Sequence, residues 1–127
     1  KGSQKYPFPL GLFKSDIGNF IAFVSNLSSK NLLNDFVKRF RRLAEFPSDG
    51  VAFPQVIPGI SWSDQRSFWE FDYPAIMVTD TAFFRYPYYH SQEDTPDKIC
   101  YDHMVRVVSG LSKVIGDFAN EPSSLVL

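Results

Sequence analysis

The sequence has few of the residues on which many functional sites depend. Among its 127 residues there is one cysteine, Cys100, and there are two histidines, His90 and His103. A single cysteine excludes an internal disulfide and a cluster of cysteine metal ligands. A catalytic cysteine needs a partner that lowers the pKa of its thiol, and no histidine in the sequence is marked as one. Cys100 is therefore interpreted as a residue without a chemical role.

Strong net charge and long apolar runs are also missing. The formal net charge is −1, which gives no electrostatic argument for a nucleic-acid partner or an anionic membrane. No apolar run reaches the roughly 18 residues that a membrane span requires. Residues 1–5 lack the apolar core of a signal peptide. We therefore expect neither a nucleic-acid partner nor a membrane span.

Aromatic residues, by contrast, are abundant. They make up 17% of the chain, while hydrophobic residues make up 44% and charged residues 21%, a composition that argues against disorder. A chain of this length buries roughly two-thirds of its unfolded surface, which is enough for a hydrophobic core. We therefore expect residues 1–127 to belong to one domain.

Apolar runs alternate with segments of helical period, and this order predicts an α/β fold with one sheet flanked by helices. An irregular loop is expected over the Pro- and Gly-containing residues 1–14. Strands are expected at 19–24, 51–57 and 74–79, and helices at 28–45, 64–71 and 101–120. The first strand is apolar on both faces and the third is expected to be buried. Pro54 places the second strand at an edge or a bulge.

The two long helices each carry an apolar stripe at three- and four-residue spacing. In the first helix the stripe consists of Leu32, Leu33, Phe36, Val37, Phe40 and Leu43. In the last helix it consists of Tyr101, Met104, Val108, Leu111, Ile115 and Phe118. The basic cluster Lys38, Arg39, Arg41 and Arg42 lies off the first stripe and is interpreted as a solvated surface.

The segment 80–98 is the place where a functional site is expected. It follows the third strand, and α/β sheets bind ligands outside the carboxyl ends of their strands. Structureless loops of this length are usually functional or disordered. Five aromatic residues precede His90 and three acidic residues follow it. A histidine beside carboxylates can bind zinc, although a lone histidine in an aromatic loop is more often a packing or surface residue.

Three segments in order, 63–69, 73–83 and 89–97, carry a family resemblance. They read Ser-Asp-Gln-Arg-Ser-Phe-Trp, Tyr-Pro-Ala-Ile-Met-Val-Thr-Asp-Thr-Ala-Phe and Tyr-His-Ser-Gln-Glu-Asp-Thr-Pro-Asp. This order resembles the bacterial co-catalytic di-zinc aminopeptidases, such as the leucine aminopeptidases, whose family also contains glutaminyl cyclases. The family pattern is Ser-Asp-His-x-x-Phe, then Gly- or Tyr-Pro-Ala, then His-Thr-x-x-Asp-Thr. Residues 101–111 resemble its closing helix, and residues 17–24 resemble an earlier strand.

The resemblance implies a zinc-exopeptidase fold of the phosphorylase/hydrolase-like type, with a mixed sheet whose N-terminal half is missing. Residues 1–127 would be the C-terminal portion of one catalytic domain. The complete enzyme would be a hydrolase, a metallopeptidase that removes N-terminal residues from a peptide substrate with two zinc ions. The family is often exported, which favours a periplasmic or secreted location.

The resemblance also assigns roles to residues of the third segment. His90 would bind one zinc ion, and Tyr89 would donate a hydrogen bond to the developing oxyanion. Asp94 is expected to orient a metal ligand or to close the loop on itself, and a turn or cap is the alternative. Four further aromatic residues could wall a pocket for an apolar side chain, or could be core or a subunit interface: Phe83, Phe84, Tyr86 and Tyr88.

The sequence departs from the family pattern in several places. Gln65 stands where the family has His, and Ser91 stands where it has Thr. The early His-x-Asp, the Glu-Glu pair and a later metal-binding Asp have no counterpart. A catalytic zinc takes three protein ligands, so this chain alone is expected to bind no zinc and to be inactive. A non-catalytic relative that serves as a binding module, and a glutaminyl cyclase, are the alternatives.

The fragment interpretation also predicts association. A part of a continuous sheet leaves an open strand edge and uncovered apolar surface. We therefore expect the chain to self-associate or to pair with the missing N-terminal half.

Overall fold

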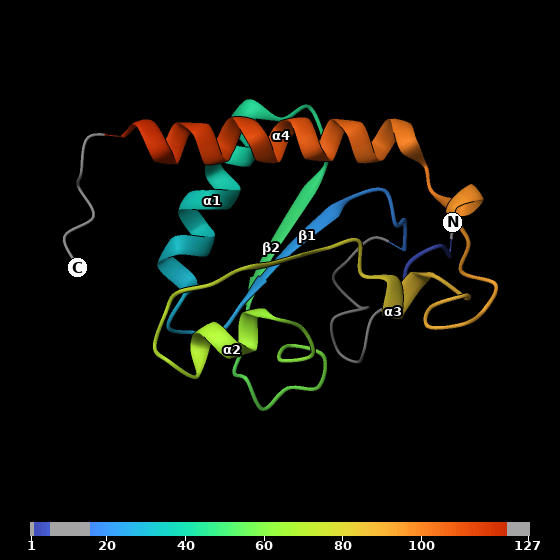
Figure 1. The fold of residues 1–127 in the computed structure, drawn as a ribbon, viewed down its shortest axis with the longest axis horizontal. Helices are drawn as coiled ribbons and strands as arrows, with labels where there is room; N and C mark the ends of the chain where they lie inside the picture. The colour runs from blue at the N-terminus through green and yellow to red at the C-terminus, as the bar shows by residue number, and fades with distance from the viewer. Residues whose placement is uncertain (1, 6–15, 122–127) are drawn as a thin grey trace.

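A computed structural model describes residues 2–5 and 16–121 of the chain. Most of the loop expected over residues 1–14 lies outside the described residues. The described chain forms a small α/β fold, in which a three-stranded mixed sheet lies between two long helices on one face and a short helix with irregular loops on the other (Figure 1). The α/β class expected from the sequence is confirmed. Among the described residues, no helix combines the length and apolar character needed to cross a membrane.

The sheet is built around a fully buried central strand. Its strands are β1 (Ile21–Ser25), β2 (Ser48–Ala52) and β3 (Met77–Thr79), in the order β2-β1-β3. The strand β2 runs parallel to β1, whereas β3 runs antiparallel to it. All five residues of β1 are buried, because its side chains are apolar or small on both faces. The expectation for residues 19–24 is confirmed.

The two edge strands differ from expectation. The strand expected at 51–57 begins three residues earlier and ends at Ala52. Pro54 cannot donate to a sheet, and the backbone instead turns, with the amide of Ile57 donating to the carbonyl of Pro54 at 3.1 Å. The third strand was expected to be buried, but it is short and lies at an edge of the described sheet, with Val78 40% exposed.

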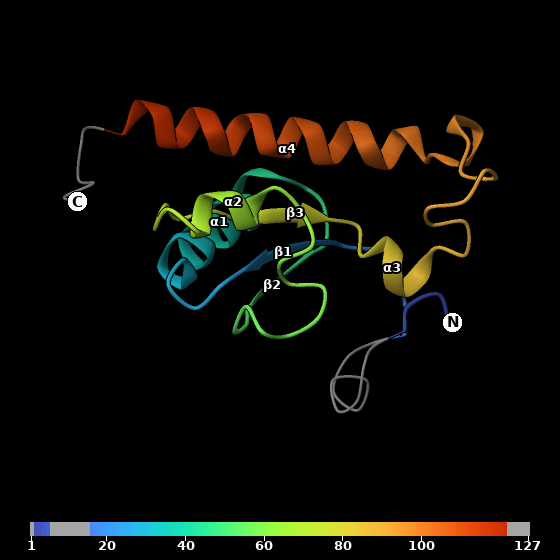
Figure 2. The ribbon, with the colours of Figure 1, turned by 60° about the horizontal axis from the view of Figure 1, so that its bottom comes forward.

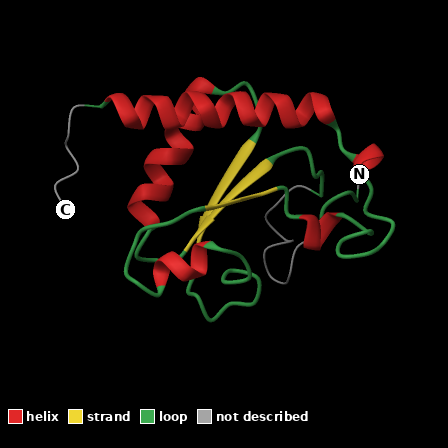
Figure 3. Cartoon of the chain, viewed as in Figure 1, coloured by secondary structure: helices red, strands yellow, loops and turns green. Residues whose placement is uncertain are grey.

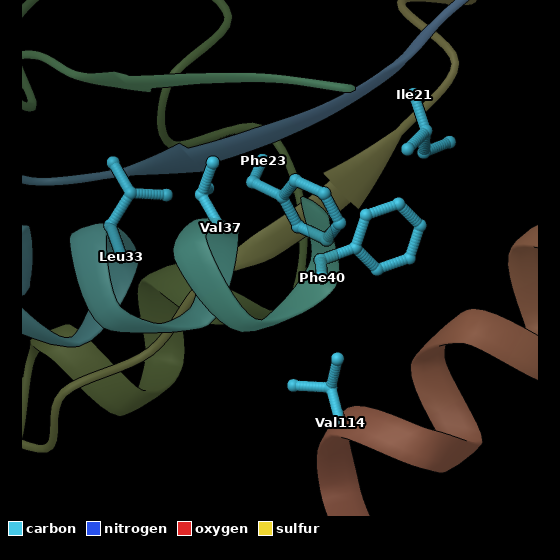
Figure 4. Close-up of a cluster of buried hydrophobic side chains, with 6 residues drawn as sticks. All are labelled: Ile21, Phe23, Leu33, Val37, Phe40 and Val114. Carbon is cyan, nitrogen blue, oxygen red and sulfur yellow. The ribbon is translucent and has the colours of Figure 1, made fainter. Parts of the chain in front are cut away.

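The main core lies between β1 and the two long helices, α1 (Lys30–Leu43) and α4 (Tyr101–Asn120). Figure 4 shows its buried side chains, which come from β1, α1 and α4: Ile21, Phe23, Leu33, Val37, Phe40 and Val114. Phe23 and Phe40 meet edge to face with ring centroids 4.9 Å apart. Burying six such side chains contributes on the order of 10 kcal/mol of hydrophobic stabilisation before chain entropy is counted.

The opposite face of the sheet is covered by less regular structure. Ala22 and Val24 of β1 pack against Ile60 and against Trp69 of the short helix α2 (Gln65–Trp69). Figure 3 shows that long loops flank α2 and also separate the small helix α3 (Ala82–Arg85) from α4. The segment 80–98 is therefore not structureless, since it contains α3 and a 3-10 turn at Pro96–Lys98.

The last helix has the expected bounds but not the expected buried face. Its buried positions are Gly110 and Val114, with Val107, Leu111 and Phe118 partly buried. Four members of the expected stripe are at least half exposed: Tyr101, Met104, Val108 and Ile115. The reason is Gly110, because a Cβ there would lie 2.4 Å from the Cβ of Ala44 and 2.9 Å from the ring of Phe40. The missing side chain lets the glycine face of α4 approach α1 most closely.

Arg39 was expected on a solvated surface, and this expectation is wrong. Its side chain is only 12% exposed and joins the two long helices through ion pairs. The guanidinium donates to Asp117 at 2.7 Å and to Glu121 at 2.7 Å on α4, and to Asp35 on its own helix at 3.1 Å. It also lies 4.2 Å from the ring centroid of Phe118. Lys38, Arg41 and Arg42 are exposed.

The close helix crossing predicts opposite effects for two glycines of α4. Gly110→Ala should lower the free energy of unfolding by about 1–3 kcal/mol, because the new methyl group clashes with Ala44 and Phe40. Gly116→Ala is the matched control. A Cβ at Gly116 meets nothing within 4 Å, so the better helix propensity of alanine should raise the free energy by about 0.5–1 kcal/mol. Denaturant titrations followed by circular dichroism measure both changes. Stabilisation by both substitutions would contradict the crossing.

Candidate functional site

The aromatic segment follows the carboxyl end of β3, as expected, but this end does not coincide with the carboxyl ends of β1 and β2. Thr79, the last residue of β3, pairs with Ala22 near the start of β1, because the two strands are antiparallel. The carboxyl ends of the parallel strands, at Ser25 and Ala52, lie at the opposite end of the sheet. The ligand-binding rule for parallel sheets therefore does not apply to this segment. Its placement depends on local contacts instead.

Arg85 holds the helix α3 against the sheet. Its guanidinium donates to the carbonyl oxygens of Gly18 at 2.8 Å and of Phe20 at 3.1 Å, just before β1. Its Nε donates to the hydroxyl of Thr81 at 3.0 Å, and its charge lies 4.7 Å from the ring centroid of Phe20. One side chain thus ties both ends of α3 to the start of the central strand.

Residues 2–5 attach to the same helix from the other side. Gln4 is buried, and its side-chain oxygen accepts a hydrogen bond from the hydroxyl of Thr81 at 3.0 Å. The amide of Lys5 donates to the carbonyl of Phe84 at 3.0 Å. The aromatic segment therefore starts from a platform assembled from three distant parts of the chain.

A chain of ring contacts runs across the surface from Trp62 to His90. Phe83 is its centre, and its ring centroid lies 5.2 Å from Trp62, 5.1 Å from Phe84 and 6.0 Å from Tyr89, each close to perpendicular. Tyr89 stacks on His90 with centroids 4.0 Å apart and planes at 16°. These residues, Trp62, Phe83, Phe84, Tyr89 and His90, are called the aromatic cluster below. Edge-to-face contacts of this kind stabilise by about 0.5–1.5 kcal/mol each.

Trp62 is the member of the aromatic cluster that sequence reasoning missed. It lies directly before the Ser-Asp-Gln motif and is 60% exposed, as expected of a surface residue rather than a core residue. Its contact with Phe83 brings the residue before the first motif segment beside the last residue of the second. The available signal was its position directly before Ser63, in a loop between the second and third expected strands.

His90 and Tyr89 are exposed on a turn. The backbone of His90 is in the left-handed region with φ 56°, and the amide of Ser91 donates to the carbonyl of Tyr88 at 3.0 Å. The ring of His90 stacks on Tyr89, and the residue is exposed. Across residues 2–5 and 16–121, no group of three His, Cys, Asp or Glu side chains is placed to hold a metal ion. His90 by itself therefore does not make a zinc site.

Asp94 bonds to Tyr86 rather than to His90 in this structure. The hydroxyl of Tyr86 donates to the carboxylate of Asp94 at 2.9 Å, which joins the start and the end of the turn. Partial burial, followed by this hydrogen bond, raises the pKa of Tyr86 to about 12. The neighbouring Ser91 bonds to Glu93 and lowers the pKa of that carboxyl group. The acidic residues of the motif therefore organise the turn.

The four aromatic residues expected to wall a pocket fall into two groups. Phe83 and Phe84 belong to the aromatic cluster. Tyr86 and Tyr88 meet each other at 5.5 Å, and the ammonium of Lys98 lies 4.9 Å from the ring of Tyr88. Tyr88, like Phe83, is more than one-third exposed. Both groups come from residues 83–89, directly before His90 in the sequence.

An open cavity of about 290 Å³ lies between α2 and β3, beside the first motif segment. Its lining comes from both elements and the residues before β3: Ser63, Asp64, Gln65, Phe68, Ala75, Ile76, Met77 and Val78. Gln65 itself is buried, and its side-chain amide donates to the carbonyl of Ile60 at 2.8 Å. At the position where the aminopeptidase pattern has a histidine, this chain has a side chain engaged with the backbone.

Comparisons with known proteins identify a longer relative. The chain is 38% identical over 111 residues to a protein of Escherichia coli (strain K12) described as the uncharacterized protein YfbL. The alignment covers 87% of this chain and 34% of YfbL, so the chain spans about a third of the length of that relative. No protein-family model and no solved structure matches the chain.

The Tyr86–Asp94 hydrogen bond predicts how tyrosine ionisation depends on pH. The folded pKa of Tyr86 lies above its ordinary value of 10.0, at about 12. The associated stability is therefore fully present below pH 10 and is lost as pH rises through about 12. Asp94→Asn should lower the pKa of Tyr86, but not to its ordinary value, because partial burial is the larger cause.

Ultraviolet absorbance of tyrosinate against pH measures this change. Subtracting the titration of a Tyr86→Phe variant isolates Tyr86 from the other five tyrosines. Asp97→Asn is the matched control, because Asp97 contributes least to the raised pKa. Equal effects of Asp94→Asn and Asp97→Asn would contradict the hydrogen bond.

Proposed function

We propose that this chain is the C-terminal portion of the catalytic domain of a zinc-dependent aminopeptidase, which removes N-terminal residues from peptides. The observation that carries the proposal is the run of ring contacts from Trp62 through Phe83 to Tyr89 and His90. It links the residue that precedes the first motif segment of the aminopeptidase resemblance with the end of the second segment and the start of the third. Trp62 and Phe83 are not neighbours in the sequence, so their contact arises from the fold and supports the proposal.

The exposed side chains of the aromatic cluster suit peptide recognition. The hydroxyl of Tyr89 can donate a hydrogen bond to the oxyanion that forms when a peptide carbonyl is attacked. Trp62 and Phe83 expose apolar ring faces that can hold the side chain of an N-terminal residue. His90 presents an imidazole beside Tyr89, where it can supply one metal ligand. A zinc ion, when bound, polarises a carbonyl and activates water.

Among the described residues, His90 belongs to no group of three His, Cys, Asp or Glu side chains that could hold a metal ion. No side chain of the described residues is assigned the role of the general base. Zinc binding is therefore proposed for the assembled domain, in which ligands from elsewhere join His90. The isolated chain is proposed to be inactive.

A non-catalytic peptide-binding module is a second candidate, which the environment of Gln65 favours. Its side chain is buried and bonded to the carbonyl of Ile60, so this position serves the fold rather than proton transfer. An aromatic surface without catalytic partners would still bind a peptide end.

The activity test compares the isolated chain with a chimera, namely YfbL carrying this chain in place of its matched stretch. With added zinc, the chimera should hydrolyse leucyl-anilide and the isolated chain should not. Tyr89→Phe in the chimera should lower kcat by about 100-fold with little change in KM, because one oxyanion donor is lost. Tyr73→Phe is the matched control, since Tyr73 is 65% exposed and outside the aromatic cluster.

The contrary outcomes lead to different conclusions. Zinc-dependent turnover by the isolated chain that is lost in His90→Ala would show that no further ligands are needed. A chimera that binds peptides without hydrolysing them would favour the binding module. Conversion of an N-terminal glutamine to a cyclic product would favour the cyclase.

A further inference from the structure

Another open cavity, of about 300 Å³, lies between α1 and β2. Figure 2 shows the three strands side by side, with β2 at one edge of the sheet. Five of the residues that line the cavity come from α1 and one comes from β2: Leu33, Asn34, Val37, Lys38, Arg41 and Gly50. The volume suits a small organic molecule.

The base of this cavity is apolar. Leu33 and Val37 are buried, and Figure 4 shows both side chains pointing from α1 toward the strands. Gly50 lies directly against Val37, because a Cβ at Gly50 would be 2.8 Å from Cγ2 of Val37. The glycine therefore lets β2 approach α1 closely at this point. A ligand in the cavity would meet two aliphatic side chains at its base.

The rim of the cavity is basic. Asn34, Lys38 and Arg41 are exposed and recur at four- and three-residue spacing, so they lie along one side of α1. Among residues 2–5 and 16–121, neither Lys38 nor Arg41 forms an ion pair with a carboxylate. No described acidic residue lines the cavity. Two positive charges thus border one small cavity whose lining contains no negative charge.

The backbone of β2 holds Arg41 in place. Nη2 of its guanidinium donates to the carbonyl of Ser48 at 3.1 Å. An arginine has five N–H groups, so the others stay available for a ligand. A guanidinium that is already held loses less freedom when it binds an anion than a freely moving side chain does.

Asp49 is the acidic residue of β2 that lies next to Gly50 in the sequence. Side chains alternate along a strand, so Asp49 and Gly50 belong to opposite faces of the sheet. Val51, on the same side as Asp49, packs in the cluster beneath α2. One carboxylate oxygen of Asp49 accepts a hydrogen bond from the amide of Gly50 at 3.0 Å. Its charge therefore serves the backbone of β2 and is not part of the cavity lining.

We propose that this cavity binds a small organic phosphate monoester. Its phosphate group would lie between Lys38 and Arg41, and its apolar part would lie against Leu33 and Val37. A phosphate monoester carries a charge of about −1.5 to −2 near neutral pH, which matches two cations better than the single charge of a carboxylate does. Guanidinium and ammonium groups donate to phosphate oxygens, and Asn34 adds an amide donor.

The inference does not depend on the proposed peptidase function. No residue of this cavity belongs to the aromatic cluster, and all six lie on α1 and β2. The test accordingly uses the 127-residue chain without zinc or peptide.

Titration of the isotope-labelled chain with phenyl phosphate, followed by its amide resonances, measures binding and locates it. The amides of Asn34, Lys38 and Gly50 should shift saturably. Phenyl phosphate should bind about tenfold more tightly than inorganic phosphate, because part of its ring is buried against the apolar base. Benzoate carries the same ring with a single charge and should bind more weakly than phenyl phosphate.

Three substitutions separate a built site from general attraction to a basic helix. Lys38→Gln and Arg41→Gln should each weaken binding of phenyl phosphate about fivefold, the effect of one lost exposed ion pair. Lys30→Gln is the matched control, because Lys30 is exposed on the same helix but does not line the cavity. Lys38 is exposed and has no ion pair with a described residue, so Lys38→Gln should leave the thermal unfolding midpoint unchanged.

Three results would overturn the proposal. The first is the absence of a saturable shift at millimolar phenyl phosphate. The second is an equal affinity for phenyl phosphate and inorganic phosphate, which would leave the apolar base without a role. The third is an equal loss of affinity in Lys30→Gln and Lys38→Gln, which would mean that the anion senses only the overall charge of the helix.

Discussion

The burial of β1 on both faces is the constraint on which the rest of the described structure depends. Phe23 and Ile21 point to one side, and Ala22 and Val24 point to the other. A strand that is apolar on both faces requires cover on two sides and a neighbour at each edge. The helices α1 and α4, the helix α2, and the strands β2 and β3 meet these requirements. The burial of the five residues of β1 thus accounts for the layers of the fold.

The candidate site is coupled to that strand through a single side chain. Arg85 donates to the carbonyl oxygens of Gly18 and Phe20, which immediately precede β1, and so fixes where α3 begins its turn toward His90. Residues 2–5 brace the same helix. The aromatic surface is therefore positioned by the rigid centre of the molecule although it is itself exposed, an arrangement typical of functional loops on a scaffold.

Parts of the described structure stay uncovered although β1 is fully buried. The described elements cover β1 on both faces, but they leave the outer edge of β3 unpaired and several apolar side chains of α4 exposed. Under the proposed function, metal ligands from other parts of a longer polypeptide would join His90.

Local patterns were enough to predict several elements. The helix at residues 101–120 and the apolar strand near residues 19–24 have the expected positions, because period and composition act over neighbouring residues. The apolar character of the loop around His90 was likewise apparent from the sequence. The boundaries of the strand near Pro54 were less predictable, because a proline indicates a break but not whether the strand lies before it or after it.

The sequence by itself determined the α/β class, the helix periods and the residue types available for chemistry. Only the tertiary structure decided the direction of β3, the buried side of α4, the burial of Arg39 and the contact of Trp62 with Phe83. Each depends on residues far apart in the chain. Arg39 is buried because it pairs with Asp117 and Glu121 of another helix. The buried side of α4 is set by the close approach of Gly110 to Phe40 and Ala44. Such pairings arise from packing in three dimensions, and no local period encodes them.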